Sequence, residues 1–180
     1  MKINKTFIED LLIIEPQLFK DDRGFFYESY NKNNLDKIIN IVFVQDNVSK
    51  SNKGVIRGLH FQKPPFEQTK LVRCVSGKIL DVIVDIRKNS KTYGKSFSIE
   101  LSSKNNKQLL VPKGFAHGFQ VISDEAIVNY KVDEYYDPDS ESGIIWNDKD
   151  LSIAWNLDIK PILSEKDLKL DLFKKLKSPF

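Results

Sequence analysis

Between about residues 40 and 135 the chain is a series of short β-branched and aromatic runs separated by turn residues, and this pattern constrains the fold most. The runs predict eight strands, at 41–48, 55–62, 69–75, 78–86, 95–101, 107–112, 117–122 and 126–132. Strands at this near-regular spacing favour a sandwich or barrel over βαβ units, which need a helix between successive strands. We therefore expect a mostly β fold, and among such folds a jelly-roll barrel.

Only the two ends of the chain have a helical pattern. Asn34 is placed to cap a short helix over 35–39, and Ser164 to begin one over 164–176. Ser164 and Asp167 stand three residues apart, as in a capping box. Apolar residues form part of one face of the second helix, namely Leu168, Leu170, Leu172 and Phe173. We expect both helices to be short and to pack on the outside of the barrel.

The composition excludes several classes of protein. The 180 residues, 41% of them hydrophobic, fit one domain over residues 1–180 with a single core. No apolar run could span a bilayer, and Glu9 and Asp10 interrupt the apolar stretch that a signal sequence needs. The net charge of +3 arises within residues 160–180, so the body has no basic stripe for nucleic acid. The one cysteine, Cys74, excludes an internal disulfide. We expect a cytoplasmic protein that binds neither nucleic acid nor membranes.

The two histidines, His60 and His117, both lie in glycine-rich strand segments. PKGFAH, which ends at His117, matches the P-x-G-x-x-H element of the cupin superfamily, in which a tight turn aims the histidine into the barrel. A metal-binding cupin also needs an H-x-H pair, but the residues at His60 are HFQ. Two histidines leave too few ligands for a tightly held transition metal. The sequence therefore favours a metal-free site.

Eight segments in chain order carry a closer resemblance: DRGFFYE (22–28), VQDNVSKSNKGVIRGLHFQ (44–62), QTKLVR (68–73), DVIVDIRKNSKTYGK (81–95), VPKGFAHGF (111–119), YKVDEYYDP (130–138), GIIWNDKDLSIAW (143–155) and ILSEKD (162–167). In these segments the chain resembles the dTDP-4-dehydrorhamnose 3,5-epimerase family. The resemblance spans nearly the whole chain, in the same order and spacing. It implies a homodimeric, metal-free cupin without a cofactor, which inverts C3 and C5 of a dTDP-linked 4-keto-6-deoxy sugar on the way to dTDP-L-rhamnose.

Inversion of carbon next to a ketone needs a base near neutral pKa, a positive group at the developing enolate oxygen and an acid across the sugar ring. His60 is the natural base, because imidazole titrates near the working pH. The resemblance implies that Asp167 pairs with His60 and orients it. By composition alone, the spacing from Ser164 favours a capping role for Asp167, and one carboxylate could serve both roles.

Lys70 is the candidate for the enolate oxygen. In TKLVRCV the period of two places Lys70 on the same face as Val72 and Cys74, so we expect it to point inward. We expect Asp81, in the next strand, to pair with it. The alternative is a solvated lysine on the surface of the barrel.

Tyr130 shares a face with Val128 and Ala126, which also points it inward. The resemblance implies that Tyr130 is the acid opposite His60, and the alternative is a core tyrosine with a bonded hydroxyl. Because the resemblance gives the base role to His60, we expect His117 to contact the sugar or to support the site from behind.

A diphosphate needs cationic groups, and Arg57 is the best placed, followed by Arg23, with Arg73 a further candidate for substrate binding. Strict alternation puts Arg57 and His60 on opposite faces of their strand. Both can serve one site only if Gly58 forms a β-bulge. The sequence leaves this point open.

The remaining expected contacts follow from the resemblance alone. Residues expected to reach the nucleotide across the dimer are Phe19, Arg23 and Glu28. Residues expected to hold the base and phosphates within the chain are Gln45, Asn47 and Tyr136. The pair Tyr135 and Tyr136 suits stacking on thymine, and the sequence does not say which ring does so.

Three alternatives to a 3,5-epimerase remain. A relative that inverts C3 alone, or that acts on another nucleotide-linked keto-sugar, would share the same residues. A non-catalytic sugar-binding cupin would tolerate loss of His60 or Tyr130, and their joint presence with Lys70 and Asp167 argues against it. A metal-dependent oxygenase is disfavoured by the missing H-x-H pair.

Overall fold

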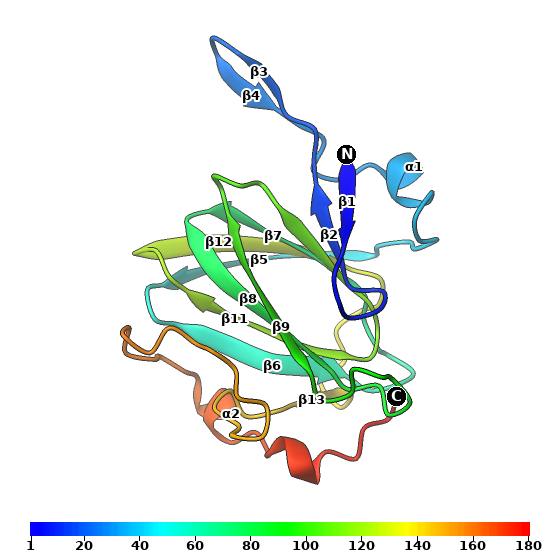
Figure 1. Cartoon of the computed structure of the whole chain (residues 1–180), viewed down its shortest axis with the longest axis vertical. Helices are drawn as coiled ribbons and strands as arrows, with labels where there is room; N and C mark the ends of the chain where they lie inside the picture. Colours follow the sequence, from blue (N-terminus) through cyan, green and yellow to red (C-terminus); the bar gives the residue numbers. More distant parts are fainter.

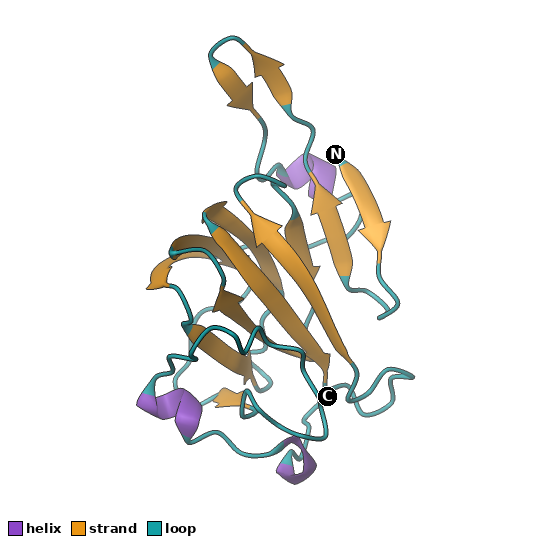
Figure 2. Cartoon of the chain, turned by 60° about the vertical axis from the view of Figure 1, so that its left-hand side comes forward, coloured by secondary structure: helices purple, strands orange, loops and turns teal.

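The computed structural model describes residues 1–180, and two antiparallel sheets face each other in it (Figure 1). The six-stranded sheet has the order β1-β2-β10-β7-β12-β5, and the five-stranded sheet has the order β13-β6-β11-β8-β9. A separate hairpin, β3-β4, projects away from this body at one end (Figure 2). The bounds are β1 Lys2–Lys5, β2 Leu12–Glu15, β3 Phe19–Asp21, β4 Gly24–Phe26, β5 Gln45–Asn52, β6 Ile56–Gln62, β7 Lys70–Ser76, β8 Lys78–Asp85, β9 Ser96–Ser102, β10 Gln108–Val111, β11 Phe115–Val121, β12 Glu125–Val132 and β13 Glu141–Gly143.

The five-stranded sheet is buried on both faces, as strand β8 illustrates. Ile83 points between the two sheets into the larger core cluster, with Val72 and Phe119. Val84 points the other way, into a second cluster that includes Trp155. Each such fully buried aliphatic side chain contributes about 1.5–3 kcal/mol to folding. This two-sided burial explains the nearly continuous apolar run in β8.

The jelly roll expected from the sequence is confirmed, and each of the eight expected strands overlaps an observed one. The expectation of a helical N-terminal end was wrong, because β1 and β2 extend the six-stranded sheet beside β10. β3, β4 and the short β13 were also missed. These five strands have three or four residues each, which is too short for a periodic pattern.

Both expected helices occur, but their bounds differ from the prediction. Helix α1 is Lys32–Leu35, and its N-cap is Asn31 rather than Asn34, because the Asn31 side chain accepts the Asn34 amide. Helix α2 is Glu165–Leu168, a single turn capped by Ser164, and a 3-10 turn, η1, follows at Phe173–Lys175.

Tertiary hydrogen bonds explain why α2 stops early. The Asp171 carbonyl accepts from the Ile145 amide at 2.9 Å, and the Phe173 amide donates to the Asp148 carboxylate at 2.7 Å. These bonds use backbone groups that a longer helix would need for itself. The C-terminal segment is therefore fixed across the outer face of the five-stranded sheet.

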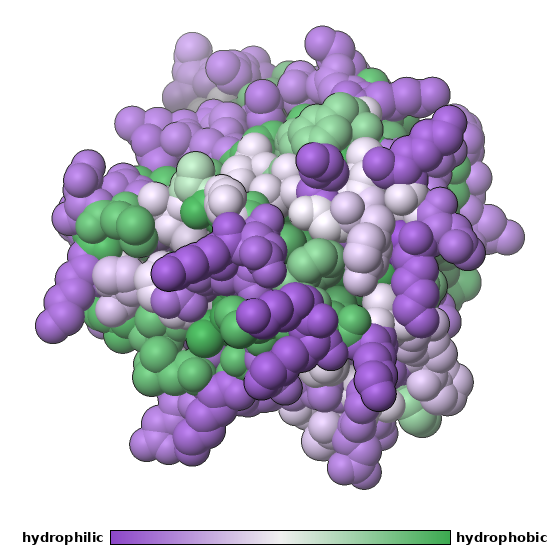
Figure 3. Space-filling model, turned by 60° about the horizontal axis from the view of Figure 1, so that its bottom comes forward, coloured by the Kyte–Doolittle hydropathy of each residue, from purple (hydrophilic) through white to green (hydrophobic).

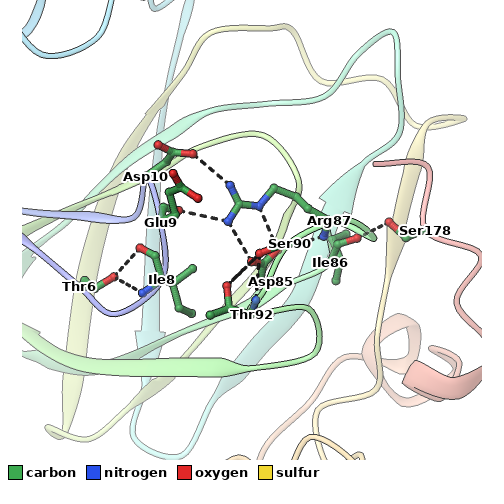
Figure 4. Close-up of polar contacts among 10 residues, drawn as sticks. All are labelled: Thr6, Ile8, Glu9, Asp10, Asp85, Ile86, Arg87, Ser90, Thr92 and Ser178. Atoms are coloured by element: carbon green, nitrogen blue, oxygen red, sulfur yellow. Dashed lines mark hydrogen bonds and ion pairs between the residues drawn. The ribbon is translucent and has the colours of Figure 1, made fainter.

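A polar cluster at the far end of β8 ties three parts of the chain together (Figure 4). The buried Asp85 accepts from Arg87, Ser90 and Thr92, and Arg87 also reaches Asp10 at 3.1 Å. Burial raises the pKa of Asp85, but these hydrogen bonds lower it by more. The pKa of the carboxyl therefore lies below its usual range. The cluster holds the β1-β2 loop against the barrel by contacts of an ionised carboxylate.

The lower end of the molecule carries the C-terminal segment, and apolar side chains are exposed there among hydrophilic ones (Figure 3). The exposed apolar residues of this segment include Leu157, Ile162 and Leu168. No helix in the structure has the length and apolar character needed to cross a membrane.

Candidate active site

Two adjoining cavities bring most of the expected site residues together. The larger, of about 450 Å³, is lined by Arg57, His60, Lys70, His117, Tyr130 and Asp167 among others. The smaller, of about 240 Å³, shares His60, Lys70 and Tyr130 and adds Gln45, Asn47, Tyr136 and Glu141. Another cavity of about 510 Å³ lies beside the β1-β2 loop, but no histidine, arginine or tyrosine lines it. The chemistry therefore identifies the first two as the candidate site.

The C-terminal segment delivers Asp167 to His60. Ile162 pairs with Val55 just before β6, and its backbone exchanges hydrogen bonds with Gly54 and Ile56 at 2.9 Å. Helix α2 therefore begins beside β6, the strand that carries His60. Asp167 lies 107 residues from His60 in the chain, so only the tertiary fold could join them.

His60 and Asp167 form a short hydrogen bond, with His60 Nε2 2.5 Å from Asp167 Oδ1. The other oxygen, Oδ2, accepts from the Ser164 hydroxyl at 2.9 Å, while the Asp167 amide donates to that hydroxyl. The capping and pairing roles therefore coexist. Burial raises the pKa of Asp167, but the hydrogen bond and charge of His60 and the Ser164 hydroxyl lower it below its usual value. An ionised carboxylate only accepts, so Nε2 carries the proton and Nδ1 is the nitrogen with a free lone pair.

A β-bulge at Gly58 brings Arg57 and His60 to the same cavity. His60 is opposite His117 and Arg57 is opposite Phe119, so one extra residue of β6 is accommodated between them. Gly58 has a φ of +105°, and a Cβ atom there would lie 2.5 Å from the His117 carbonyl oxygen. Only glycine fits this position. The question that alternation left open is thus answered.

Lys70 points into the cavity, on the face of β7 that also carries the buried Val72 and Cys74. Burial lowers the pKa of Lys70 to about 8, against the raising influence of Asp81 and Glu141. The ammonium is therefore mainly charged at neutral pH. The ion pair expected between Lys70 and Asp81 does not form, because Asp81 instead bonds His117, Oδ1 to Nε2, at 2.8 Å.

Tyr130 lines both cavities, and its strand neighbours Val128 and Ala126 lie in the core. Burial raises the pKa of Tyr130, although the positive charge of Arg57 partly opposes this. The hydroxyl therefore keeps its proton at neutral pH. No protein hydrogen bond acts on this hydroxyl, unlike that of a core tyrosine with a bonded hydroxyl.

The residues expected to bind the nucleotide within the chain lie together in the smaller cavity. Gln45 donates to the Asn47 side chain at 2.9 Å and accepts from the Tyr136 amide at 3.2 Å. The Tyr135 and Tyr136 side chains are both exposed, and Tyr136 is the one that lines the cavity.

Four expected binding residues lie away from both cavities of their own chain. Phe19 and Arg23 belong to the projecting β3-β4 hairpin, where Arg23 bonds Asp21. Glu28 accepts from Asn31 near the base of that hairpin. Arg73 faces outward from β7, three residues from the inward Lys70, and donates to Asn129.

Two residues at the site escaped the sequence analysis. Glu141, in β13, forms an ion pair with Lys166 and accepts from the Tyr136 hydroxyl at 2.6 Å. Burial raises the pKa of Glu141, but Lys166 and Tyr136 lower it below its usual value. Lys166 directly precedes Asp167 in the sequence, and this position could have indicated that Lys166 lies at the site. The three residues of β13 gave no such indication for Glu141.

No cluster of three or more His, Cys, Asp or Glu side chains is placed to hold a metal ion. Metal-free chemistry stays a prediction.

Comparison with known proteins identifies relatives of the whole chain. Residues 5–175 match the family model described as dTDP-4-dehydrorhamnose 3,5-epimerase. The Escherichia coli protein of that name is 52% identical over 172 residues, covering 94% of this chain and 93% of the relative. A crystal structure of the Bacillus anthracis enzyme with TDP and PPi bound is 54% identical, with a TM-score of 0.93, and covers 96% of this chain and 99% of that one.

A Legionella pneumophila dTDP-6-deoxy-D-glucose-3,5-epimerase, solved with dTDP-4-keto-L-rhamnose, is 44% identical. Its TM-score is 0.94, and the match covers 98% of this chain and 94% of that one. The similarity therefore extends through the barrel, the hairpin and the C-terminal segment alike.

Proposed function

The chain belongs to the dTDP-4-dehydrorhamnose 3,5-epimerase family, and on this premise we propose how its cavity inverts C3 and C5 of a nucleotide-linked sugar. The protein is an isomerase of dTDP-rhamnose biosynthesis with a cupin fold. It converts dTDP-4-dehydro-6-deoxy-D-glucose to dTDP-4-dehydro-L-rhamnose. The observation that carries the mechanism is the convergence of the His60–Asp167 pair, Lys70 and Tyr130 on one cavity.

The reaction removes a proton from carbon beside the C4 ketone and returns one from the other face. His60 takes the proton on Nδ1, because Nε2 is committed to Asp167. The ionised Asp167 stabilises the imidazolium that results. Lys70 places its positive charge at the C4 oxygen, where the enolate develops, and Tyr130 donates the proton from the opposite face. C3 and C5 both adjoin C4, so the same groups serve both inversions.

The nucleotide lies across the smaller cavity and its rim. Gln45, Asn47 and Tyr136 contact the base and phosphates from one side. Arg57, anchored by its 3.0 Å bond to the Ser51 hydroxyl, supplies a cationic fork to the diphosphate. Lys166, which lines the same cavity and pairs with Glu141, adds a second cation.

The chain acts as a homodimer, and the β3-β4 hairpin supports this proposal. A two-stranded hairpin is marginally stable alone, yet this one exposes Phe19, Phe25 and Phe26, with Phe26 66% exposed. Exposed apolar groups of this kind mark a contact with another chain. Packed on a partner, the hairpin brings Phe19 and Arg23 to the partner's nucleotide, which explains why they lie outside their own cavity.

Replacing Phe26 with aspartate should therefore break the dimer. Wild-type protein should sediment at twice the 20.8 kDa of one chain, and Phe26→Asp at the mass of one chain. The KM of Phe26→Asp should rise about tenfold or more. The monomer loses the charged hydrogen bond that Arg23 of the other chain is proposed to donate to the nucleotide. Leu157→Asp, an equally exposed apolar residue on the C-terminal segment, is the control and should leave mass and KM unchanged. A wild-type monomer with full activity would contradict the dimer.

The epimerase reaction is tested by proton NMR of dTDP-4-keto-6-deoxyglucose with the protein in D2O. We expect deuterium to enter at both C3 and C5, because each proton is removed and replaced from solvent-exchanged groups. The same mixture without protein measures the background. Exchange at C3 alone would select the 3-epimerase alternative, and exchange at neither carbon would contradict both. The cytoplasmic location stays a prediction from the sequence.

A further inference from the structure

Ser49, in strand β5, has a buried hydroxyl without a hydrogen-bond partner. Three buried side-chain oxygens of the molecule have no such partner, namely Ser49 Oγ, Glu67 Oε2 and Asp81 Oδ2. Of these three residues only Ser49 lines the candidate site, in the larger cavity. A buried hydroxyl left unpaired is costly, so its place beside a cavity points to a ligand atom that completes it.

Ser49 belongs to a row of polar side chains on the inner face of β5. Residues two apart in a strand share a face, and the members of the row are Gln45, Asn47, Ser49 and Ser51. In the register of β5 with β12, Asn47 is opposite Tyr130 and Ser49 is opposite Val128, which lies in the core. Side chains of directly opposite residues lie on the same face of a sheet. The Ser49 side chain therefore points between the two sheets.

The order of this row matches the order of the parts of a nucleotide-linked sugar. Gln45 and Asn47 line the smaller cavity, where the base is proposed to lie. Ser51, two residues beyond Ser49, accepts from Arg57 Nε at 3.0 Å and fixes the guanidinium that is proposed to bind the diphosphate. Ser49 lies between these two positions and lines the same cavity as Arg57. The diphosphate is therefore the part of the substrate that passes Ser49.

The polar neighbours of Ser49 in the row are already engaged. Asn47 Oδ1 accepts from the Gln45 side chain at 2.9 Å, and the Ser51 hydroxyl accepts from Arg57. Residues two apart in a strand are separated by about 7 Å along the chain, and a serine side chain is short. The Ser49 hydroxyl is therefore free to donate to a group that enters the cavity.

We propose that Ser49 is a substrate-binding residue whose hydroxyl donates to an oxygen of the diphosphate. The inference rests on the proposed function, in which Arg57 binds the same diphosphate. A serine hydroxyl supplies one donor and phosphate oxygens are acceptors, so the contact pairs the buried hydroxyl. A hydrogen bond to an anionic oxygen is stronger than one between neutral groups. Ser49 and Arg57 together hold the diphosphate.

The test compares binding of dTDP and of thymidine to wild type and Ser49→Ala by titration calorimetry. In Ser49→Ala the Kd for dTDP should rise about tenfold, because a hydrogen bond to a charged group is lost. The Kd for thymidine, which has no phosphate, should not change. In the deuterium assay KM should rise about tenfold and kcat should stay near that of wild type, because the contact is to a part of the substrate that does not react.

The free energy of unfolding separates this role from a structural one. Because the Ser49 hydroxyl has no protein partner to lose, the urea midpoint of Ser49→Ala should equal or exceed that of wild type. Ser102→Ala is the matched control, since Ser102 is a buried serine of β9 whose hydroxyl accepts from the Asn105 amide at 3.2 Å. Ser102→Ala should lose stability and bind dTDP as wild type does.

An unchanged Kd for dTDP in Ser49→Ala would overturn the inference, and so would an equal loss of affinity for thymidine. A urea midpoint below that of wild type would show that the hydroxyl bonds within the protein, which also contradicts it. The proposed function fails by a different result. Wild type that binds dTDP but exchanges no deuterium would refute the epimerase reaction and leave the diphosphate contact of Ser49 intact.

Discussion

His60→Ala is expected to lower the rate of deuterium entry at both C3 and C5 by a factor on the order of 10²–10⁴. The only other imidazole in the cavity is that of His117, and it is already bonded to the buried Asp81. The substrate should still bind, since His60 does not contact the nucleotide in the proposed arrangement. The loss should therefore appear in kcat and leave KM nearly unchanged.

Asp167→Asn should produce the same kind of loss with a smaller magnitude. An amide cannot stabilise the imidazolium, and it can hold His60 in the other tautomer, with the proton on the wrong nitrogen. Binding of dTDP, measured by titration calorimetry, serves as the control for folding in both variants. Wild-type turnover in His60→Ala would show that another group is the base, and His117 would then be the next candidate.

Most of the barrel was predictable because seven of its strands have seven or eight residues, which is long enough for a period of two to show. The same period placed Lys70 and Tyr130 inward, without any reference to relatives. It failed at Gly58, where one bulged residue returns Arg57 to the face of His60. A single glycine in a strand signals such a bulge, but it does not decide between a bulge and a close approach.

The rest of the site depends on contacts between distant segments, which local patterns do not specify. Asp167 reaches His60 only because Ile162 pairs beside β6, so its capping pattern with Ser164 gave no sign of the second role. Asp81 was expected to meet Lys70 through strand adjacency. In the structure β8 lies beside β11, in the sheet opposite β7, and the histidine of β11 takes the carboxylate.

Short segments gave the least information for the same physical reason. Glu141 belongs to a strand of three residues, whose pairing with β6 places it beside the cavity. The β3-β4 hairpin is equally short, and its phenylalanines remain largely exposed within one chain. In both cases the role of the segment depends on what it packs against, which for Glu141 is β6 and for the hairpin is the proposed partner chain.

Tyr130→Phe should separate the two halves of the reaction. His60 and Lys70 remain in this variant, so the proton is still removed and deuterium still returns from the side of the base. Deuterium entry should stay within about threefold of wild type, while inversion should slow by a factor on the order of 10²–10⁴ for want of the acid. The fold should be nearly unaffected, because the hydroxyl has no protein hydrogen bond to lose.

The measurement compares the rate of deuterium entry by NMR with the rate at which a coupled reductase traps the inverted sugar as dTDP-L-rhamnose. Tyr136→Phe is the matched control, since it also removes one hydroxyl from the site, but that hydroxyl donates to Glu141 at 2.6 Å. It should change exchange and inversion by the same factor, because it acts on substrate binding. Equal losses in Tyr130→Phe would mean that Tyr130 positions the sugar. No loss would mean that water or another side chain delivers the proton, because the phenylalanine ring keeps the packing and removes only the donor.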